Sequence, residues 1–453
     1  MSQHGPWEEV WRRFDPEEPA KDPAWRADRP HSPVRRILRK LGLPFAGANT
    51  AMLLSGTTGS GKSTELLRVR DARKGNDLVL FLDLLRHFRD IGDADALQRV
   101  EAWEVVYQAG IAVLGAAQET LPYPVPPELI DGLTKAWERV ADATQTPKVE
   151  LDLGKIASGM IAAGSVLLPL LDLPAGGATA LAVATGVGAA KATADGVRRI
   201  VPIGRSQKSL PDQDEAVETL LGAVNLIIGH VQMNARRVVL VIDGLDWIRG
   251  EERQLALFDR SELLGRLACP ALICAPYTLL SSTRARNLRR FDPFVLANEP
   301  VLDRGNLEQD GPGVTFFREV YERRTRDIDG GFLIADELVR ELAYFSGGRA
   351  REFTKLVREV AERAFSDGLE KATQQLVEEV IADARRECER GLHAGHAEVL
   401  RRVREDPARL PESPEALKLI ENARLLPFDN DAPWFAPHPL LLKRFLRETG
   451  STG

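Results

Sequence analysis

The residues best suited to chemistry form one Gly-rich stretch, which follows a short apolar strand and runs into a helix pattern. Its nine residues are Gly56, Thr57, Thr58, Gly59, Ser60, Gly61, Lys62, Ser63 and Thr64. They fit the pattern G-x-x-x-x-G-K-[ST] in full. The glycines let consecutive N–H groups face one point, and the helix starting near Lys62 adds its positive dipole there, so a phosphate would bind at that point. Lys62 would bridge the outer phosphates, and the Ser63 hydroxyl would be a Mg²⁺ ligand. A Gly-rich turn that binds nothing is the alternative, and the agreement of strand, motif and helix argues against it.

A second apolar strand ends in a carboxylate. Five apolar residues, 238–242, lead into Asp243. An acid at the carboxyl end of such a strand would face the ligand-binding edge of an open α/β sheet and hold Mg²⁺ through water. Many P-loop ATPases place the water-activating acid immediately after this one, but Gly244 stands there, so Asp246 is the nearest substitute. The alternatives are a strand-end cap for Asp243 and a surface or N-cap acid for Asp246.

Two later stretches carry arginines that could sense a phosphate. Gly347 and Gly348 separate two helix patterns, which would aim Arg349, Arg351 or both at a fixed point near the junction. The alternative is a helix C-cap with solvated arginines. The run from Arg284 to Arg290 could supply an arginine finger to a neighbouring subunit, or it is a solvated helix face.

The elements that must position these residues indicate an α/β fold. Apolar runs predict a parallel sheet with helices on both faces, ending in an edge strand over 294–302, and the Gly-rich motif makes this the sheet expected of a P-loop NTPase. Charged amphipathic segments at 314–324, 334–345, 351–367 and 372–389 predict a helical lid. Two short extended runs around residue 430 predict a hairpin, which suits a small winged-helix-like unit. We therefore expect an N-terminal segment (1–45), a core (46–310) with an apolar insertion (150–205), a lid (311–390) and a C-terminal unit (391–453).

The apolar insertion contains two uncharged arms within 156–190, separated by Asp172 and by a turn at Pro174, Gly176 and Gly177. Each arm is a little short for the roughly 20 residues of a bilayer span. One interpretation is an Ala/Gly-rich helical hairpin packed on the protein or on a neighbouring subunit. The other is a membrane-inserting hairpin with small-residue helix contacts.

Composition narrows the class of protein. Of 453 residues, 44% are hydrophobic and 28% are charged, as in folded soluble proteins, and the net charge of −6 gives no overall attraction to nucleic acid. Three cysteines without metal-ligand spacing indicate thiols in a reducing compartment. Because the first residues show no basic and apolar leader pattern, we expect a cytoplasmic location, with membrane association if the hairpin inserts.

With the Gly-rich loop, Asp243 to Asp246, Gly347-Gly348-Arg349 and the winged-helix-like end in this order, the chain resembles bacterial AAA+-like ATPases of the STAND and origin-recognition branches. Its apolar insertion also resembles that of the KAP P-loop ATPases, whose membrane helices lie at that position. The resemblance implies ATP and Mg²⁺ as ligands, held by Lys62, Ser63 and the Walker B acid Asp243. It also implies that Arg349 or Arg351 is the second sensor, and that 284–290 is the region of any finger.

The function implied is an ATP-binding, slowly hydrolysing switch that controls homo-oligomerisation or signalling to a protein partner, in a setting such as phage defence. Slow hydrolysis is expected because Gly244 replaces the usual acid. An alternative from another class is a nucleotide-stabilised, membrane-associated scaffold that acts through 156–190. A DNA-binding ATPase is the weaker alternative, because the chain is acidic and its C-terminal unit lacks a clear basic, aromatic-interleaved surface.

Overall fold

The computed structural model forms two compact units, which we call the sheet unit and the lid unit. The sheet unit comprises Val34–Ser55 and Leu66–Phe294; the lid unit comprises Met1–Pro33, Gly56–Glu65 and Val295–Gly453. The apolar insertion predicted at 156–190 lies outside the described residues, apart from two residues of one strand. The structure describes residues 5–43, 50–86, 94–121, 125–146, 166–167, 208–281, 288–328, 333–430 and 432–442.

A six-stranded sheet has the order β3-β2-β4-β5-β1-β6. Its strands are β1 Ala51–Gly56, β2 Leu78–Asp83, β3 Val166–Leu167, β4 Val238–Asp243, β5 Ala271–Pro276 and β6 Phe291–Val295. Strand β4 pairs in parallel with β2 and β5, which confirms the predicted α/β class with a parallel sheet. The register sets Asp83 opposite Asp243. Strand β3 pairs antiparallel with β2, so these two residues of the predicted helical arm are extended and satisfy backbone groups along β2.

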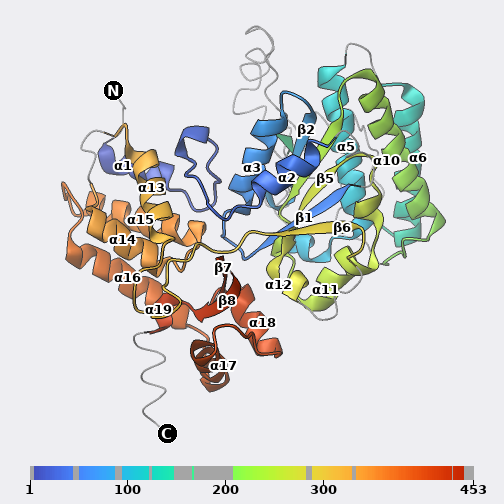
Figure 1. The fold of residues 1–453 in the computed structure, drawn as a ribbon. Helices are drawn as coiled ribbons and strands as arrows, with labels where there is room; N and C mark the ends of the chain where they lie inside the picture. Colours follow the sequence, from blue (N-terminus) through green and yellow to red (C-terminus); the bar gives the residue numbers. More distant parts are fainter. Residues whose placement is uncertain are drawn as a thin grey trace. The chain divides into compact units, whose positions relative to one another are not determined.

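Helices cover both faces of the sheet (Figure 1). On β2, Leu78, Leu80 and Leu82 join a core with α5, α6 and α10, while Val79 and Phe81 are buried on the opposite face. Alternate residues of a strand point to opposite faces, so burial of both sets explains the nearly continuous apolar runs. The helices of this unit are α2 Val34–Leu41, α3 Lys62–Arg73, α5 Ala102–Thr120, α6 Pro127–Thr144, α10 Glu215–Asn234, α11 Glu251–Leu255 and α12 Tyr277–Ser281. The first four residues of α3, up to Glu65, belong to the lid unit. Short turns are η2 Ala94–Arg99, η3 Leu245–Trp247, η4 Ala256–Arg260 and η5 Leu263–Arg266.

Helix α10 is the one described helix that is long and apolar enough to cross a membrane, by length and composition alone, with a mean hydropathy of 1.3. In this structure it packs against α5 and α6 and buries seven apolar side chains. They are Val217, Leu220, Leu221, Val224, Ile227, Ile228 and Val231.

The last strand lies earlier than the sequence predicted. Strand β6 ends at Val295, whereas the apolar pattern placed it over 294–302. Between β6 and residue 302 the chain makes single bridges: Asn298 with Phe428 and Leu302 with Asp310. The apolar residues beyond 295 are therefore buried by contacts within the lid unit and not by a ladder of the main sheet.

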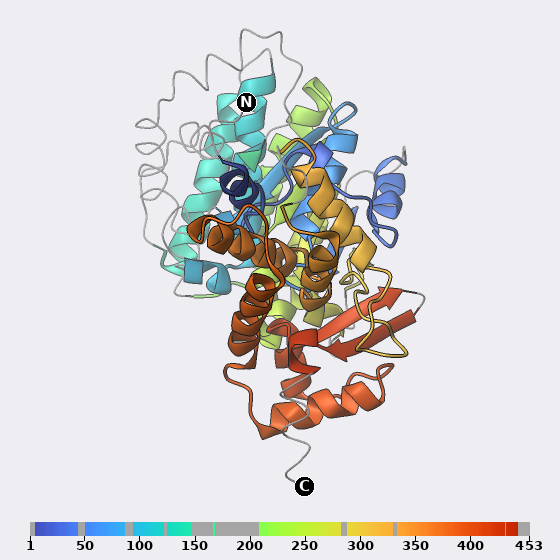
Figure 2. The same cartoon turned by 90° about the vertical axis from the view of Figure 1, so that its left-hand side faces the viewer.

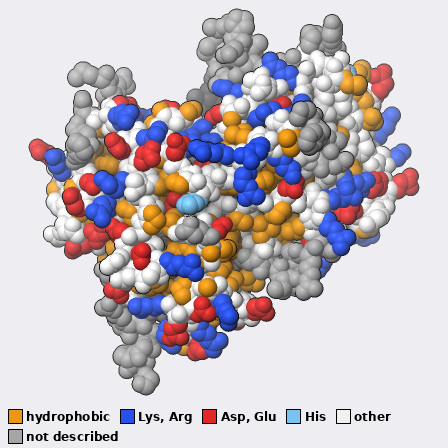
Figure 3. Space-filling view, viewed as in Figure 1, with side chains coloured by type: hydrophobic (Ala, Val, Ile, Leu, Met, Phe, Trp, Pro, Cys, Tyr) orange, Lys and Arg blue, Asp and Glu red, His pale blue; other side chains and the backbone are white. Residues whose placement is uncertain are grey.

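The lid unit is built on helices α13 Val314–Thr325, α14 Asp336–Phe345, α15 Ala350–Ser366 and α16 Gln374–Glu389, as predicted. The N-terminal residues, with α1 Pro6–Arg13 and the turn η1 Pro23–Trp25, complete its core. Phe14 lies 6.4 Å from Phe353, ring centre to ring centre, and the Trp7 indole donates to the carbonyl of Leu369 at 2.7 Å. Acidic and basic side chains alternate over the solvent face of these helices (Figure 3), as expected of amphipathic helices.

Two helices and a hairpin follow the lid helices, as a winged-helix-like unit requires (Figure 2). The two strands of the hairpin pair antiparallel, and Phe428 stacks on its cross-strand partner Trp434 with ring centres 4.5 Å apart. The elements are α17 Ala394–Glu405, α18 Pro414–Glu421, β7 Leu425–Asn430, β8 Ala432–Pro437 and α19 Pro439–Leu442.

His438, between β8 and α19, is a buried histidine in the lid unit. Only 2% of its surface is exposed, and its Nδ1 accepts a hydrogen bond from the Leu440 N–H at 3.3 Å. Burial holds the pKa of His438 well below its usual range, and the nearby charges of Arg349 and Arg424 lower the pKa further. The native protein therefore keeps this imidazole neutral while the unfolded chain protonates it.

His438 predicts an acid-dependent loss of stability. Because the unfolded imidazole takes up a proton below pH about 6.5 and the native one does not, the free energy of unfolding falls with decreasing pH by up to about 1.4 kcal/mol per pH unit. Denaturant unfolding between pH 7.5 and 5 should show this slope in the parent chain, and His438→Gln should remove it. Parallel pH profiles for the two proteins would contradict the assignment.

Candidate functional site

The Gly-rich loop has the backbone of a phosphate cradle. Gly59 and Gly61 have φ angles of +85° and +102°, which side-chain-bearing residues rarely adopt, and α3 begins at Lys62. The buried Lys62 ammonium donates to the carbonyls of Gly56 and Thr57, both at 2.8 Å. Ser63, the predicted Mg²⁺ ligand, is the second residue of the helix. The loop thus combines a helix N-terminus with a fixed cation, which is an anion-binding arrangement.

Both arginines predicted as sensors lie against this loop. The Arg349 side chain donates to the carbonyl of Thr58 from Nε at 3.1 Å and from Nη2 at 2.7 Å. The Arg351 N–H donates to the carbonyl of Gly59 at 3.0 Å, and its Nε donates to Pro16 at 3.1 Å. The structure thus brings the predicted junction to the P-loop within the lid unit, and the sensing roles of both residues remain predictions.

Gly59 permits the close approach of this junction. A Cβ atom at Gly59 would lie 3.0 Å from the Cβ of Arg351 and 3.1 Å from Nη2 of Arg349. Any side chain there would be strained by the positive φ angle and would crowd both arginines. The glycine therefore serves contact with the lid as well as the backbone turn.

Two further residues lie at this site, Asn298 and Glu299, and no sequence motif indicated them. The Thr57 hydroxyl donates to Oδ1 of Asn298 at 2.7 Å, and Nδ2 of Asn298 donates to the carbonyl of Pro427 in β7 at 3.1 Å. The Glu299 N–H donates to the carbonyl of Gly348 at 3.0 Å. Both residues fall in the stretch that the apolar pattern assigned to an edge strand, so no local signal distinguished them.

The N-terminal residues also contact the loop and the start of α3. The Ser32 hydroxyl donates to Glu65 at 2.5 Å, and the Ala20 N–H donates to the Thr64 hydroxyl at 3.2 Å. Nε of Arg29 lies 2.7 Å from Oε1 of Glu299 in a buried ion pair. Burial raises the pKa of Glu299, and the charge of Arg29 opposes that rise.

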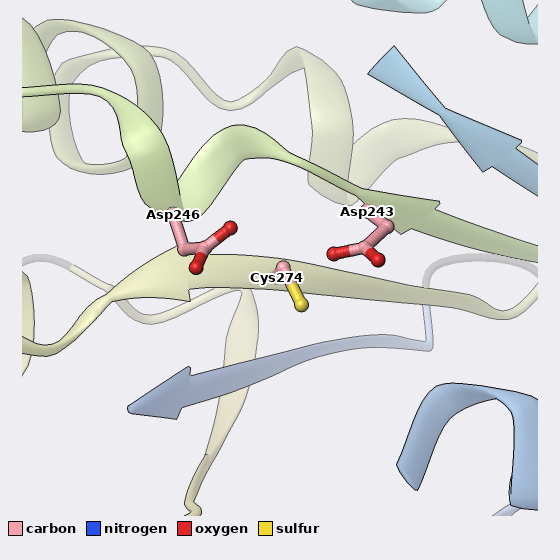
Figure 4. A group of neighbouring side chains, drawn as sticks. All are labelled: Asp243, Asp246 and Cys274. Carbon is pink, nitrogen blue, oxygen red and sulfur yellow. The ribbon is translucent and has the colours of Figure 1, made fainter. Parts of the chain in front are cut away.

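In the sheet unit, Asp243 and Asp246 lie together with Cys274 (Figure 4). One ligand atom from each of the three side chains lies within 4.8 Å of the others. Asp243 ends β4, and its Oδ1 accepts a hydrogen bond from the Gly244 N–H at 2.8 Å. The structure therefore brings the two predicted acids together, and it adds the Cys274 thiol, which the sequence predicted only as a buried thiol without metal-ligand spacing. Their roles in metal binding and water activation remain predictions.

Gly244 stands where an acid is usual, and its surroundings explain why. Its φ angle is +94°, and a Cβ atom there would lie 2.6 Å from the backbone nitrogen of Leu85. No side chain fits at that distance without moving the backbone of Leu85. Asp246, two positions after Gly244 in η3, is the next carboxylate along the chain.

This constraint predicts a large cost for Gly244→Ala. Gly250 is a matched control, because its φ angle is also positive, +81°, but nothing lies within 4 Å of an added Cβ. Gly250→Ala should lower the free energy of unfolding by about 1–2 kcal/mol through backbone strain. Gly244→Ala should add about 1–3 kcal/mol for overpacking, as measured by denaturant unfolding. Equal losses for the two variants would show that contact with Leu85 is not limiting.

The arginine run is described only at its end. Residues 282–287 lie outside the described part of the chain, and Arg290 donates from Nε to Glu262 at 2.7 Å. Both side chains of this pair are about half exposed. An arginine finger from this run therefore remains a prediction.

Comparisons with known proteins find only distant likenesses. No protein-family model and no curated protein sequence matches the chain. Among solved structures, the Aeropyrum pernix ORC2 protein (ADPNP–ADP complexes) is 12% identical over 97% of this chain and 96% of its own, with a TM-score of 0.40. Cdc6p from Pyrobaculum aerophilum is 10% identical over 97% of both chains, with a TM-score of 0.38. The Aeropyrum pernix ORC1 protein, in complex with DNA, is 13% identical over 98% of both chains, with a TM-score of 0.39. Likenesses this low assign no function, which must come from the site itself.

Proposed function

We propose that the chain binds ATP at Gly56–Thr64, hydrolyses it slowly and uses its nucleotide state as a switch. The observation that carries this proposal is the contact of the Arg349 guanidinium with the Thr58 carbonyl, on a loop that fits the P-loop pattern in full. A cation from the lid is thereby held against the loop that would cradle the phosphates. Adenine is preferred to guanine by resemblance, since no N-K-x-D follows the strand that ends at Asp243.

Within this proposal each residue of the cradle has a distinct task. Backbone N–H groups of the loop and the N-terminus of α3 bind the inner phosphates. Lys62 exchanges its two carbonyl partners for oxygens of the outer phosphates and neutralises the charge that develops during transfer. Arg349, or Arg351 beside it, reads the presence of the γ-phosphate. Asp246 orients the attacking water.

Hard oxygen donors of the chain suit Mg²⁺. The Ser63 hydroxyl and the Asp243 carboxylate are ligands of the kind that this ion shares with substrate phosphates. Bound there, Mg²⁺ would neutralise phosphate charge. The proposal assigns Asp243 and Ser63 to hold the ion, and it assigns no ligand role to Cys274, because a thiol is a poor ligand for so hard a cation.

The switch follows from what Arg349 is attached to. Arg349 is the residue that immediately precedes α15, and the carbonyl of Gly348 before it accepts a hydrogen bond from the Glu299 N–H. A shift of the Arg349 guanidinium toward a γ-phosphate would therefore strain the start of this lid helix. We propose that this shift controls homo-oligomerisation or binding of a protein partner. Phage defence, the scaffold alternative through 156–190 and the DNA-binding alternative remain predictions from the sequence.

Nucleotide titrations test the cradle. Lys62→Ala should abolish measurable binding of ATP and ADP, because it removes the main phosphate cation. Arg349→Ala should weaken ATP binding by about tenfold or more through loss of a charged hydrogen bond, with little change for ADP. Lys355→Ala, on the exposed side of the same helix, is the matched control and should change neither affinity. Parental ATP affinity in Lys62→Ala would refute the proposal.

The mass of the protein in solution tests the switch. Light scattering after size exclusion should give a larger species with a non-hydrolysable ATP analogue than with ADP or no nucleotide. Lys62→Ala should keep one mass in all three conditions, which separates nucleotide binding from nonspecific effects of the analogue. One unchanged mass in the parent chain, together with little turnover, would argue against the oligomeric switch and favour the scaffold.

A further inference from the structure

The N-terminal segment places a buried arginine against the P-loop, outside every residue that the motifs indicated. Only 3% of the Arg29 side chain is exposed. Its Nε pairs with Glu299, but Nη1 and Nη2 have no hydrogen-bond partner among the described residues. A guanidinium carries five N–H donors, and leaving buried donors unsatisfied is costly. The arrangement therefore calls for an acceptor that the described chain does not itself supply.

The two unsatisfied nitrogens face Gly61. A Cβ atom added to Gly61 would lie 3.7 Å from Nη1 and 3.8 Å from Nη2 of Arg29, with the Cβ of Ala350 at 3.6 Å. Gly61 is the residue before Lys62, at the point where the loop becomes helix α3. The guanidinium is thus aimed at the helix end of the loop.

Three contacts fix Arg29 in this position. The Glu299 carboxylate holds Nε, and the Phe316 ring lies 5.0 Å from the guanidinium carbon in a cation–π contact. The turn that follows Arg29 is tied to α3 by the hydrogen bond from Ser32 to Glu65. With Nε paired to Glu299 and Phe316 packed against the guanidinium, Nη1 and Nη2 are held as a fork near Gly61.

The side chains of Lys62 and Arg349 hydrogen-bond to the first three residues of the loop. Lys62 contacts the carbonyls of Gly56 and Thr57, and Arg349 contacts that of Thr58. These groups serve the outer phosphates in the proposed function. The helix end near Gly61 is left for the phosphate next to the ribose.

We infer that Arg29 is a further nucleotide-binding residue, whose Nη1 and Nη2 donate to the α-phosphate of a nucleoside di- or triphosphate. The inference rests on the proposed nucleotide site. Glu299 is its positioning residue, because the carboxylate keeps the fork from turning away. Since ATP and ADP share the α-phosphate, Arg29 supports both equally, whereas Arg349 distinguishes them.

Binding of ATP, ADP and the two diastereomers of adenosine 5′-O-(1-thiotriphosphate) to the full-length chain tests this inference. Arg29→Gln should weaken ATP and ADP by the same factor, about tenfold or more, because charged hydrogen bonds to both are lost. The parent chain should distinguish the two diastereomers, since sulfur replaces one α-oxygen, and Arg29→Gln should lose that distinction. Arg29→Lys keeps the charge but not the fork, so it should weaken binding less and also lose the distinction.

The outcomes separate this inference from the proposed function. If Arg29→Gln keeps the parental affinities and diastereomer selectivity while Lys62→Ala binds no nucleotide, the role of Arg29 is overturned and the proposed nucleotide site stands. Weakened binding of ATP alone would also overturn it, because the residue would then read the γ-phosphate. No binding of any nucleotide by the parent chain would instead refute the proposed function. If Arg29→Gln does not fold, the selectivity of Arg29→Lys decides the question.

Discussion

Two consecutive residues, Asn298 and Glu299, hold the site in the lid unit together. The Asn298 side chain joins Thr57 of the loop to Pro427 of the C-terminal hairpin. The Glu299 side chain fixes Arg29, and its backbone holds Gly348 so closely that an added Cβ would lie 1.9 Å from the Glu299 carbonyl oxygen. Four segments distant in sequence thereby share one anchor. Burial makes these polar contacts obligatory, since an unpaired group there would cost more than the pair gains.

Three cationic side chains gather around one loop. Lys62 and Arg349 donate to backbone carbonyls, Arg349 also lies 3.7 Å from a carboxylate oxygen of Glu352, and Arg29 pairs with Glu299. Carbonyl dipoles offset a buried cation only in part, so the cluster is stable with anionic oxygens nearby and strained without them. The local electrostatics therefore favour a polyanionic ligand despite the net negative charge of the chain.

Sequence patterns predicted the features that depend on residues close together in the sequence. Apolar runs located the sheet, and spacing alone identified the loop and placed Arg349 at the start of a helix. Arg29 and Glu299 could not be predicted, because isolated polar residues in loops carry no periodicity and meet only through pairing over 270 residues. The reason for Gly244 was equally hidden, since it depends on how closely Leu85 passes. Strand β6 ends early because Asn298, which with Glu299 and Pro300 interrupts the apolar residues of 294–302, makes tertiary contacts instead of pairing in the sheet.

The discontinuous make-up of the lid unit has a consequence for synthesis of the chain. Its first segment, Met1–Pro33, leaves the ribosome long before Val295–Gly453, which completes the same unit. Domains generally fold as units during translation, from the N-terminus onward. The sheet unit can therefore fold first, before Phe353 and Glu299, the partners of Phe14 and Arg29, have been synthesised. The loop gains its complete set of contacts only when nearly the whole protein has been made, so an interrupted translation product carries the motif without a finished site.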